Sequence, residues 1–225
     1  MIPNYFCRKI LSEDKLNHIK EIITSKDVDW TDGSLTVINP NDTEILPQKK
    51  LFETFNQDVF DIIISDLDKD MDFNSIVVPN ETKNLIISKI TEGGYYKCHL
   101  DSEFNGNYST TIFLNEPDEY IGGDLQLLID GHLKNFKLKA GWGVTYATGI
   151  PHQVLDVTEG VRYAGVFWST SIISDPFMRE IHQGLTNIQQ KLEGTDRVYS
   201  NLKEFADDPL YEIEMLKKNL IRRYR

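Results

Sequence analysis

The stretch Gly94-Tyr95-Tyr96-Lys97-Cys98-His99-Leu100-Asp101 places a histidine and an aspartate two residues apart in a segment typical of a β-strand. In an extended strand, residues i and i+2 point to the same face, so His99 and Asp101 project together and Leu100 points away. One imidazole and one carboxylate on a single face are suited to binding a divalent metal. A third ligand has to come from elsewhere in the chain, and His152 is the best candidate.

Two histidines and one carboxylate on one side of a metal leave the opposite coordination positions open. This arrangement is the facial triad suited to non-haem Fe(II) oxygen chemistry. The open positions would take dioxygen and a co-substrate, and a dicarboxylate such as 2-oxoglutarate would chelate the iron through its keto acid end. Its far carboxylate needs a permanent cation, and Arg162 suits that role because guanidinium binds carboxylate through two parallel hydrogen bonds.

A His-x-Asp pair is a weak signal by itself, because isolated His and Asp residues usually lie on the surface. Arg162 begins a strand-like segment in which Ala164, Val166 and Trp168 would share its inward face. The alternative interpretation makes His152 a hydrogen-bonded core histidine and Arg162 a surface charge. The two histidines, the aspartate and the arginine taken together favour the metal site.

Four segments carry a resemblance to a known family: GGYYKCHLD (93–101), STTIFLNEPDEYIGGDLQL (109–127), AGWGVTYATGIPHQVLDVTEGVRYAGVFW (140–168) and STSIISD (169–175). They resemble the 2-oxoglutarate- and Fe(II)-dependent dioxygenases of the prolyl-4-hydroxylase type. The similarity is greatest to the PKHD-type hydroxylases of bacteria and phages. It covers roughly residues 85–175, and the flanking regions resemble the family only in general pattern.

The resemblance implies His99, Asp101 and His152 as iron ligands and Arg162 as the partner of the 2-oxoglutarate C5 carboxylate. Tyr96 matches a tyrosine that lies beside the substrate pocket in prolyl hydroxylases. We also assign Trp168, on the inward face of its strand, to that pocket. Ascorbate is expected as a reductant beside Fe(II) and 2-oxoglutarate.

One position departs from the family pattern. Many relatives have a tyrosine nine residues before the first histidine that contacts 2-oxoglutarate, and this chain has Ile90 there. Either another polar group, such as Tyr146 or Thr111, supplies that contact, or the co-substrate is held more weakly. The segment Gly122-Gly123-Asp124-Leu125 matches the family's turn into the next barrel strand.

The activity implied by the resemblance is hydroxylation of a C–H bond, with release of succinate and CO2. The substrate would be a prolyl residue of a peptide or protein, or an amino-acid-like molecule. Tyr95, Tyr96, Tyr108 and Tyr120 would form an aromatic groove for a proline-rich strand, or be ordinary barrel surface. Two alternatives stay open, a non-catalytic jelly-roll binding module that retains the metal site and a nucleobase-directed oxygenase of the same superfamily.

Composition narrows the class of partner. The chain of 225 residues has 24 basic and 35 acidic side chains and a net charge of −11, which disfavours binding to nucleic acid. No apolar run reaches 18 residues, so we expect no membrane span. The N-terminus lacks the apolar core of a signal peptide, which predicts a cytoplasmic protein. Two cysteines, Cys7 and Cys98, are then expected as reduced thiols.

The pattern along the chain predicts helices at 12–25, 51–68, 176–192 and from about 201, interrupted at Pro209. Short strands are predicted at 3–10, 34–49 (with an irregular loop), 76–78, 84–91, 95–100, 108–114, 124–129, 133–138, 144–147, 153–157 and 163–169. Asp130-Gly131 between two apolar runs indicates a tight hairpin. Eight or nine closely spaced strands indicate a sandwich or barrel.

With a metal triad at its mouth, this pattern predicts a mainly β fold with flanking α-helices, the double-stranded β-helix or jelly roll, with N-terminal helices packed on one sheet. We expect one domain over 1–225: helical support in 1–75, the jelly-roll core in 76–170 and C-terminal helices in 171–225. Segments 39–49 and 102–107 are the candidate lids. The sequence makes no prediction of oligomeric state.

Overall fold

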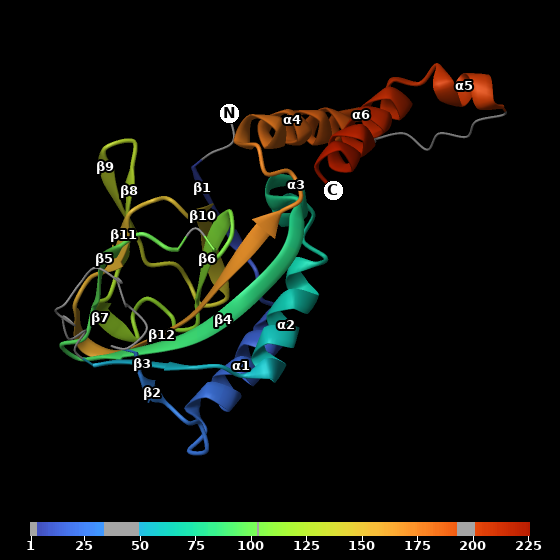
Figure 1. The fold of residues 1–225 in the computed structure, drawn as a ribbon. Coiled ribbons are helices and arrows are strands. Elements are labelled where there is room, and N and C mark those ends of the chain that lie inside the picture. The colour runs from blue at the N-terminus through green and yellow to red at the C-terminus, as the bar shows by residue number, and fades with distance from the viewer. Residues whose placement is uncertain (1–3, 34–49, 103, 193–200) are drawn as a thin grey trace.

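The computed structural model describes residues 4–33, 50–102, 104–192 and 201–225 (Figure 1). The helices are α1 (Glu13–Thr24), α2 (Gln57–Leu67), α3 (Met71–Val77), α4 (Pro176–Leu192), α5 (Leu202–Ala206) and α6 (Pro209–Tyr224). The strands are β1 (Tyr5–Lys9), β2 (Thr31–Asp32), β3 (Leu51–Thr54), β4 (Pro79–Thr91), β5 (Tyr96–His99), β6 (Tyr108–Phe113), β7 (Tyr120–Gly122), β8 (Leu125–Ile129), β9 (His132–Phe136), β10 (Trp142–Ala147), β11 (His152–Val154) and β12 (Val157–Ser171).

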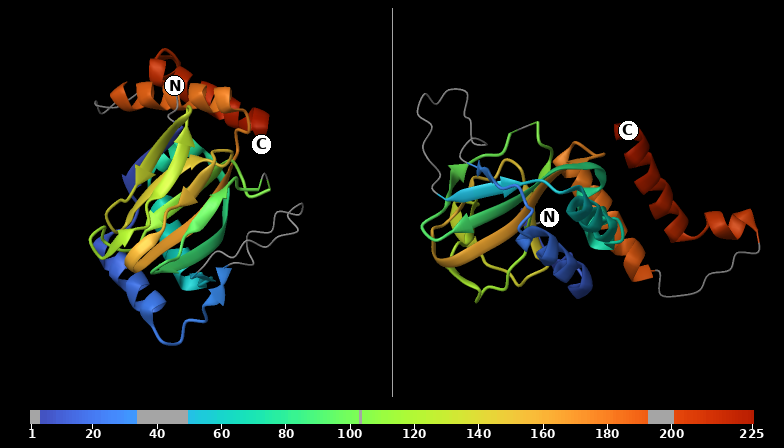
Figure 2. Two further views of the ribbon diagram at one scale, coloured as in Figure 1. Left: turned by 90° about the vertical axis from the view of Figure 1, so that its left-hand side faces the viewer. Right: turned by 90° about the horizontal axis from the view of Figure 1, so that it is seen from below.

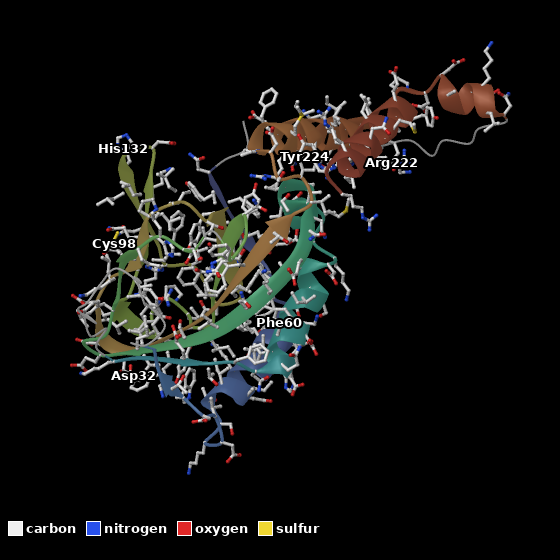
Figure 3. All side chains as sticks on the ribbon, in the orientation of Figure 1. Asp32, Phe60, Cys98, His132, Arg222 and Tyr224 are labelled. Atoms are coloured by element: carbon white, nitrogen blue, oxygen red, sulfur yellow. The ribbon has the colours of Figure 1, made fainter. Side chains whose placement is uncertain are left out.

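The strands form two antiparallel sheets. The larger sheet has the order β1-β10-β6-β12-β4-β3-β2, with β7 paired to one end of β12, and the smaller has the order β5-β11-β8-β9. The jelly roll is therefore confirmed, and α1 and α2 cover one face of the larger sheet as expected (Figures 1 and 2). Side chains fill the space between the sheets, and the exposed Cys98 lies on β5 (Figure 3).

Alternation along β12 separates the two cores. Phe167 is fully buried with Ile19 of α1 and Ile63 of α2 on the helix-covered face of the larger sheet. Arg162 and Trp168, at even positions, point between the sheets, as the period-2 pattern predicts. A second apolar cluster on that side holds the sheets together; its buried members are Phe113, Leu125, Leu127, Ile129, Phe136, Val144 and Tyr146.

The helix predicted over 51–68 is wrong in its first part. Residues Leu51–Thr54 form β3, which pairs with β4 and sets Glu53 opposite Ser88. The helix begins only after Asn56, whose Oδ1 accepts a hydrogen bond from the Val59 N–H at 3.0 Å. A cap of this kind fixes where a helix starts more firmly than apolar spacing does.

The strand predicted at 76–78 is also wrong. This apolar run ends helix α3, which Asp70 caps through a 2.8 Å hydrogen bond from the Phe73 N–H. Val78 then adopts φ 48°, a left-handed conformation that ends the helix and leads into β4. A β-branched run of three residues is compatible with either state, and the cap decides it. The short strand β7 was not predicted.

Several local predictions are confirmed. The Asp130-Gly131 turn joins β8 to β9, with both residues at positive φ. The helix predicted at 176–192 is α4, and Asp175 caps it by accepting hydrogen bonds from the Phe177 and Met178 N–H groups at 2.8 and 3.2 Å. The C-terminal helix is interrupted before Pro209, as expected.

Other predictions are not tested here. The predicted strand and loop at 34–49, with the candidate lid at 39–49, lie outside the described residues, and the lid role of 102–107 stays a prediction. So does the division into one domain with three parts. Cys7 and Cys98 are free thiols. Within the described ranges, no helix combines the length and the apolar character that crossing a membrane requires.

Candidate active site

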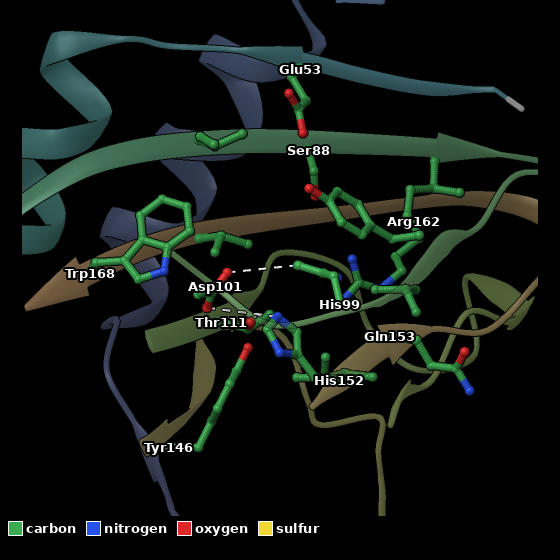
Figure 4. A pocket seen from close by; sticks show the side chains of 16 residues that line it. Glu53, Ser88, His99, Asp101, Thr111, Tyr146, His152, Gln153, Arg162 and Trp168 are labelled. Atoms are coloured by element: carbon green, nitrogen blue, oxygen red, sulfur yellow. Dashed lines mark ion pairs between the residues drawn. The ribbon is translucent and has the colours of Figure 1, made fainter. Parts of the chain in front are cut away.

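Three predicted ligands meet between the two sheets. His152 on β11 lies directly opposite His99 on β5 in the strand register, and their ring centroids are 4.2 Å apart. The Asp101 carboxylate faces both imidazoles, 3.6 Å from His99 Nε2 and 3.7 Å from His152 Nε2 (Figure 4). One donor atom from each residue lies within 4.8 Å of the others, close enough to hold one ion.

Asp101 reaches this position differently from the prediction. Strand β5 ends at His99, so Asp101 is placed by the segment after the strand rather than by strand alternation. Leu100 is exposed, which agrees with its expected outward direction. Ser109, fully buried on β6, donates a 2.5 Å hydrogen bond to Asp101 Oδ2 and fixes the carboxylate.

Backbone carbonyls set the tautomer of both histidines. His99 Nδ1 lies 2.8 Å from the Lys97 carbonyl oxygen, and His152 Nδ1 lies 2.9 Å from that of Ile150. A carbonyl can only accept a hydrogen bond, so each Nδ1 carries the proton and donates it. Each Nε2 is then left with a free lone pair beside Asp101, which is how metal-ligating histidines are usually held.

The protonation states also suit a metal. Burial lowers the pKa of His152, and the neighbouring His99 lowers it further, so the imidazole stays neutral. Burial alone would raise the pKa of Asp101. However, the neighbouring imidazoles of His99 and His152 and the hydrogen bond from Ser109 together bring it below its usual value. Two imidazoles and one carboxylate are the donor set that fits Fe(II).

Arg162 is fully buried and short of partners. Its side chain is 1% exposed, and Nε and Nη2 have no hydrogen-bond partner in the described residues. Its guanidinium carbon lies 5.4 Å from the Phe113 ring centroid. Burial lowers its pKa and the nearby Tyr120 opposes that effect. A buried cation with unused N–H donors is costly without an anion, and a carboxylate ligand would satisfy it.

The Gly-Gly turn makes room for Arg162. Gly123 has φ +66°, and a Cβ there would lie 3.2 Å from Arg162 Cδ and 3.0 Å from Tyr120 Cε2. A side chain at this position would therefore be strained and would press on both the arginine and the tyrosine. The Gly-Gly turn that the family resemblance singled out is therefore needed in this chain to leave room for Arg162 and Tyr120.

The Ile90 departure can be located in the pocket. Ile90 is the cross-strand neighbour of Arg162, so an apolar side chain borders the guanidinium. Tyr146 and Thr111, the suggested replacements, both line the pocket, and Tyr146 packs edge-on against His152 at 5.1 Å between ring centroids. Burial raises the Tyr146 pKa, so its phenol stays protonated and can donate a hydrogen bond.

The two predicted substrate-pocket residues flank the ligand cluster. The Tyr96 ring centroid lies 4.6 Å from that of His99. Trp168 and Arg162 lie on opposite sides of Asp101 (Figure 4). The Trp168 Nε1 lacks a hydrogen bond of good geometry, yet the indole lies close enough to Asp101 to help lower its pKa. Placement in the pocket is thus observed for both residues, and contact with a substrate stays a prediction.

Sequence reasoning missed three polar residues that line the same pocket: Glu53, Ser88 and Gln153. Glu53 was hidden by the helix wrongly predicted over its segment. An inward Ser88 could have been found from the alternation of β4, where Ile86 and Ile90 share its face. Tyr108 and Tyr120 are buried, so the aromatic surface groove suggested for the four tyrosines is wrong.

The family model described as the 2OG-Fe(II) oxygenase superfamily matches residues 85–170. A PKHD-type hydroxylase of Synechococcus sp. is 30% identical over 200 residues, which cover 81% of this chain and 85% of the relative. A PKHD-type hydroxylase of Gluconacetobacter diazotrophicus is 28% identical over 209 residues, which cover 86% and 91%.

Solved structures share the fold at low sequence identity. A prolyl hydroxylase from Trichoplax adhaerens, in complex with a hypoxia inducible factor peptide fragment, has a TM-score of 0.60 at 13% identity and covers 81% of this chain and 87% of its own. HygX from Streptomyces hygroscopicus, with nickel, 2-oxoglutarate and hygromycin B bound, has a TM-score of 0.54 at 10% identity, with coverages of 76% and 84%. The chain belongs to the PKHD-type hydroxylases of the 2OG-Fe(II) oxygenase superfamily, and is an oxygenase with Fe(II) and 2-oxoglutarate as its cofactors.

Proposed function

We propose that this oxygenase hydroxylates a C–H bond of a prolyl residue in a peptide or protein, or of an amino-acid-like substrate. The observation that carries the proposal is the convergence of His99, Asp101, His152 and Arg162 on one pocket. Prolyl hydroxylases among the structural neighbours support the prolyl class. Membership of an enzyme family weighs against the alternative of a non-catalytic module. A nucleobase substrate has no specific observation in its favour, and the acidic charge of the chain opposes it.

In this proposal His99, Asp101 and His152 hold the metal through two Nε2 atoms and one carboxylate oxygen. Bound Fe(II) supplies the activation of dioxygen that breaks the substrate C–H bond, while 2-oxoglutarate is converted to succinate and CO2. Ser109 and the two backbone carbonyls keep the three ligands in place before the metal arrives. Because the ligands are already held in place, less free energy is lost in ordering them when the metal binds.

Arg162 binds the far carboxylate of the co-substrate in this proposal. Its unused Nε and Nη2 donors are spaced for the two oxygens of one carboxylate. The protonated phenol of Tyr146 donates the hydrogen bond that relatives obtain from the tyrosine at the position of Ile90. Apolar walls from Ile90, Leu125 and Val154 exclude water around the pair of charges, which strengthens their attraction.

Glu53 and Ser88 are the groups we assign to substrate recognition. They face each other across β3 and β4 and line the pocket beside the co-substrate region (Figure 4). Their oxygens accept hydrogen bonds, so they suit a peptide N–H or an amino group of the substrate. Tyr96 and Trp168 provide the flat apolar surface on which a prolyl ring packs.

The first test is an anaerobic titration of the metal-free protein with Fe(II) and then 2-oxoglutarate, followed by the visible charge-transfer band of the chelate. The band should form in the native chain, fail in Asp101→Ala and require more 2-oxoglutarate in Arg162→Ala. Gln153→Ala is the control and should leave the titration unchanged, because the Gln153 side chain lines the same pocket but hydrogen-bonds Gln126. Full succinate production by Asp101→Ala would overturn the ligand assignment.

The substrate class needs a second assay. Peptides with and without proline, and free amino acids, are incubated with the loaded enzyme and analysed for the gain of one oxygen atom. The proposal expects the oxygen on a prolyl residue or an amino-acid-like molecule, with Glu53→Gln losing more kcat/KM for substrate than affinity for 2-oxoglutarate. Oxygen transfer to single-stranded DNA or RNA instead would support the nucleobase alternative and refute the proposal.

A further inference from the structure

Helix α4 presents a row of apolar side chains to the solvent. Successive residues of an α-helix are turned by about 100° around its axis. Five residues separated in turn by about 4, 3, 4 and 4 positions therefore lie within an arc of about 80° on the helix surface. We call this row the α4 stripe, and it consists of Phe177, Ile181, Gly184, Ile188 and Leu192. Its four side chains are 64, 37, 48 and 37% exposed, in chain order.

The opposite face of α4 is polar, and it is the buried one. Arg179, His182 and Thr186 are the buried residues of the helix. Arg179 Nη1 donates to the carbonyl oxygens of Ile173 and Ser174 at 2.7 and 2.9 Å, which ties the helix to the segment that follows β12. A surface helix normally turns its apolar stripe inward, so α4 is oriented the reverse way.

A reversed helix of this kind indicates an interaction surface, because monomeric proteins rarely expose a contiguous apolar patch. The stripe runs along a helix of 17 residues, or about 25 Å. It lies at the end of the molecule where α4 and α6 pack together (Figures 1 and 2). A partner can therefore reach it without meeting the pocket.

The positions in the stripe are symmetric about the midpoint between Gly184 and Leu185. If a second copy of α4 lies antiparallel on the first, Ile181 of one copy faces Ile188 of the other, and Phe177 faces Leu192. Every contact is then apolar against apolar, and the same patch serves both copies, as a two-fold interface requires. Gly184 falls beside the axis, where a Cβ would meet nothing within 4 Å, so the two backbones can approach closely.

The charges beside the stripe favour the same arrangement. Glu180 and Lys191 lie on one flank of the helix, near its opposite ends. Antiparallel pairing brings Glu180 of one copy near Lys191 of the other, twice over. In parallel pairing the two-fold axis runs along the helices, so these flanks lie on opposite sides of the interface and no such charge pair forms.

We propose that the chain forms a two-fold homodimer by antiparallel packing of α4 on α4 through the α4 stripe. One helix pair lies at the lower end of the size of specific interfaces. The dimer is therefore concentration dependent, with a dissociation constant in the micromolar range.

The test is sedimentation velocity of the full chain over a concentration series up to on the order of 100 µM. The native chain should shift from monomer to dimer across the series. Ile181→Lys and Ile188→Glu should each stay monomeric, because each places a charge opposite an isoleucine. Leu133→Glu replaces a still more exposed apolar residue on β9, and this control should dimerise like the native chain.

Mixing the two charged variants tests the direction of the helices. In an antiparallel pair, Lys at 181 faces Glu at 188 of the other variant, so the equimolar mixture should recover a dimer. In a parallel pair the two charges never meet, and the mixture stays monomeric. Three outcomes would each overturn the proposal: a native chain that is monomeric at every concentration, a dimer that survives Ile188→Glu, or a mixture of the two variants that stays monomeric. In the first case the α4 stripe would be a binding surface for a different protein.

Discussion

Two buried arginines should respond to the same substitution in opposite ways. Arg162 and Arg179 are 1% and 7% exposed, so burial does not distinguish them. Arg179 Nη1 makes two hydrogen bonds to backbone carbonyls, whereas Arg162 has no partner for Nε or Nη2 within the described residues. We therefore predict that Arg162→Met leaves the metal-free protein as stable or more stable, and that Arg179→Met destabilises it.

The magnitudes follow from the partners. Replacing a buried charge with an apolar side chain of similar size is commonly neutral or stabilising by about 1–4 kcal/mol. Losing Arg179 removes the donor from one buried carbonyl group, that of Ile173, and from one part-buried group, that of Ser174, at about 1–3 kcal/mol for the buried group. For the co-substrate, losing one side of a buried, hydrogen-bonded charge pair costs about 2–5 kcal/mol. Arg162→Met should therefore weaken 2-oxoglutarate binding by roughly one and a half to three and a half orders of magnitude.

Urea unfolding of the two metal-free variants gives the stabilities, and anaerobic titration of the Fe(II)-loaded proteins gives the 2-oxoglutarate affinities. Arg179→Met should retain native affinity while its unfolding midpoint falls. The reasoning is refuted if Arg162→Met is destabilised by more than about 2 kcal/mol and still binds 2-oxoglutarate as the native chain does, because Arg162 would then be a structural residue.

Three further predictions concern the support of the site and the helix layer. Ser109→Ala should weaken Fe(II) binding about 10–100-fold, because Asp101 loses the hydrogen bond that orients it; metal titration checks this, with Thr110→Val, whose hydroxyl bonds Thr145 instead, as the control that should not change. Gly123→Ala should lower stability by about 1–3 kcal/mol and also weaken 2-oxoglutarate binding, because φ is +66° and the added carbon presses on Arg162, while Gly149→Ala, with open space around it, should do neither. Burial, and then the charge of Lys217, lowers the pKa of His182, so as pH falls below about 6.5 the unfolded chain takes up a proton first and the stability that His182 contributes is lost. Urea unfolding between neutral and mildly acidic pH should therefore show a smaller loss of stability in His182→Gln than in the native chain, with the exposed His18→Gln as the control. An equal pH dependence of stability in His182→Gln and the native chain would contradict the assignment.

The fold and the ligand cluster could be predicted because both depend on short-range regularities. Alternation along β12 places Arg162 and Trp168 on one face, whatever packs against it. The hairpin at Asp130-Gly131 depends only on positive φ at two residues, which these types tolerate. His99 and His152 meet because their strands are neighbours in a jelly roll, a consequence of topology that the family resemblance supplied.

The errors arose where two local signals competed. Leu51 to Thr54 fits a helical apolar stripe as well as a strand, and only pairing with β4 decides the matter. That pairing is long-range, so periodicity could not reveal Glu53 as a pocket residue. At 76–78 a β-branched run was outweighed by the Asp70 cap. Asn56 and Asp70 each cap a helix by accepting a hydrogen bond from the backbone N–H of the apolar residue three positions later. A search of the sequence for this spacing would have corrected both helix boundaries.

The alternation of β12 also ties the site to the stability of the fold. Odd positions such as Phe167 complete the core under α1 and α2, while even positions carry Arg162 and Trp168 into the pocket. A slip of one residue in its pairing would place the guanidinium in the apolar helix layer and the aromatic ring in the co-substrate region. The pairing with β4 runs from Val161 opposite Thr91 to Ser171 opposite Pro79, with register shifts after Val166 and after Thr170, and it opposes such a slip at many points. The pairing that stabilises the larger sheet therefore also fixes the position of the buried Arg162 guanidinium, which we propose binds the co-substrate. Substitutions on the face of β12 that packs against α1 and α2 should accordingly weaken 2-oxoglutarate binding only when they also disturb the pairing with β4.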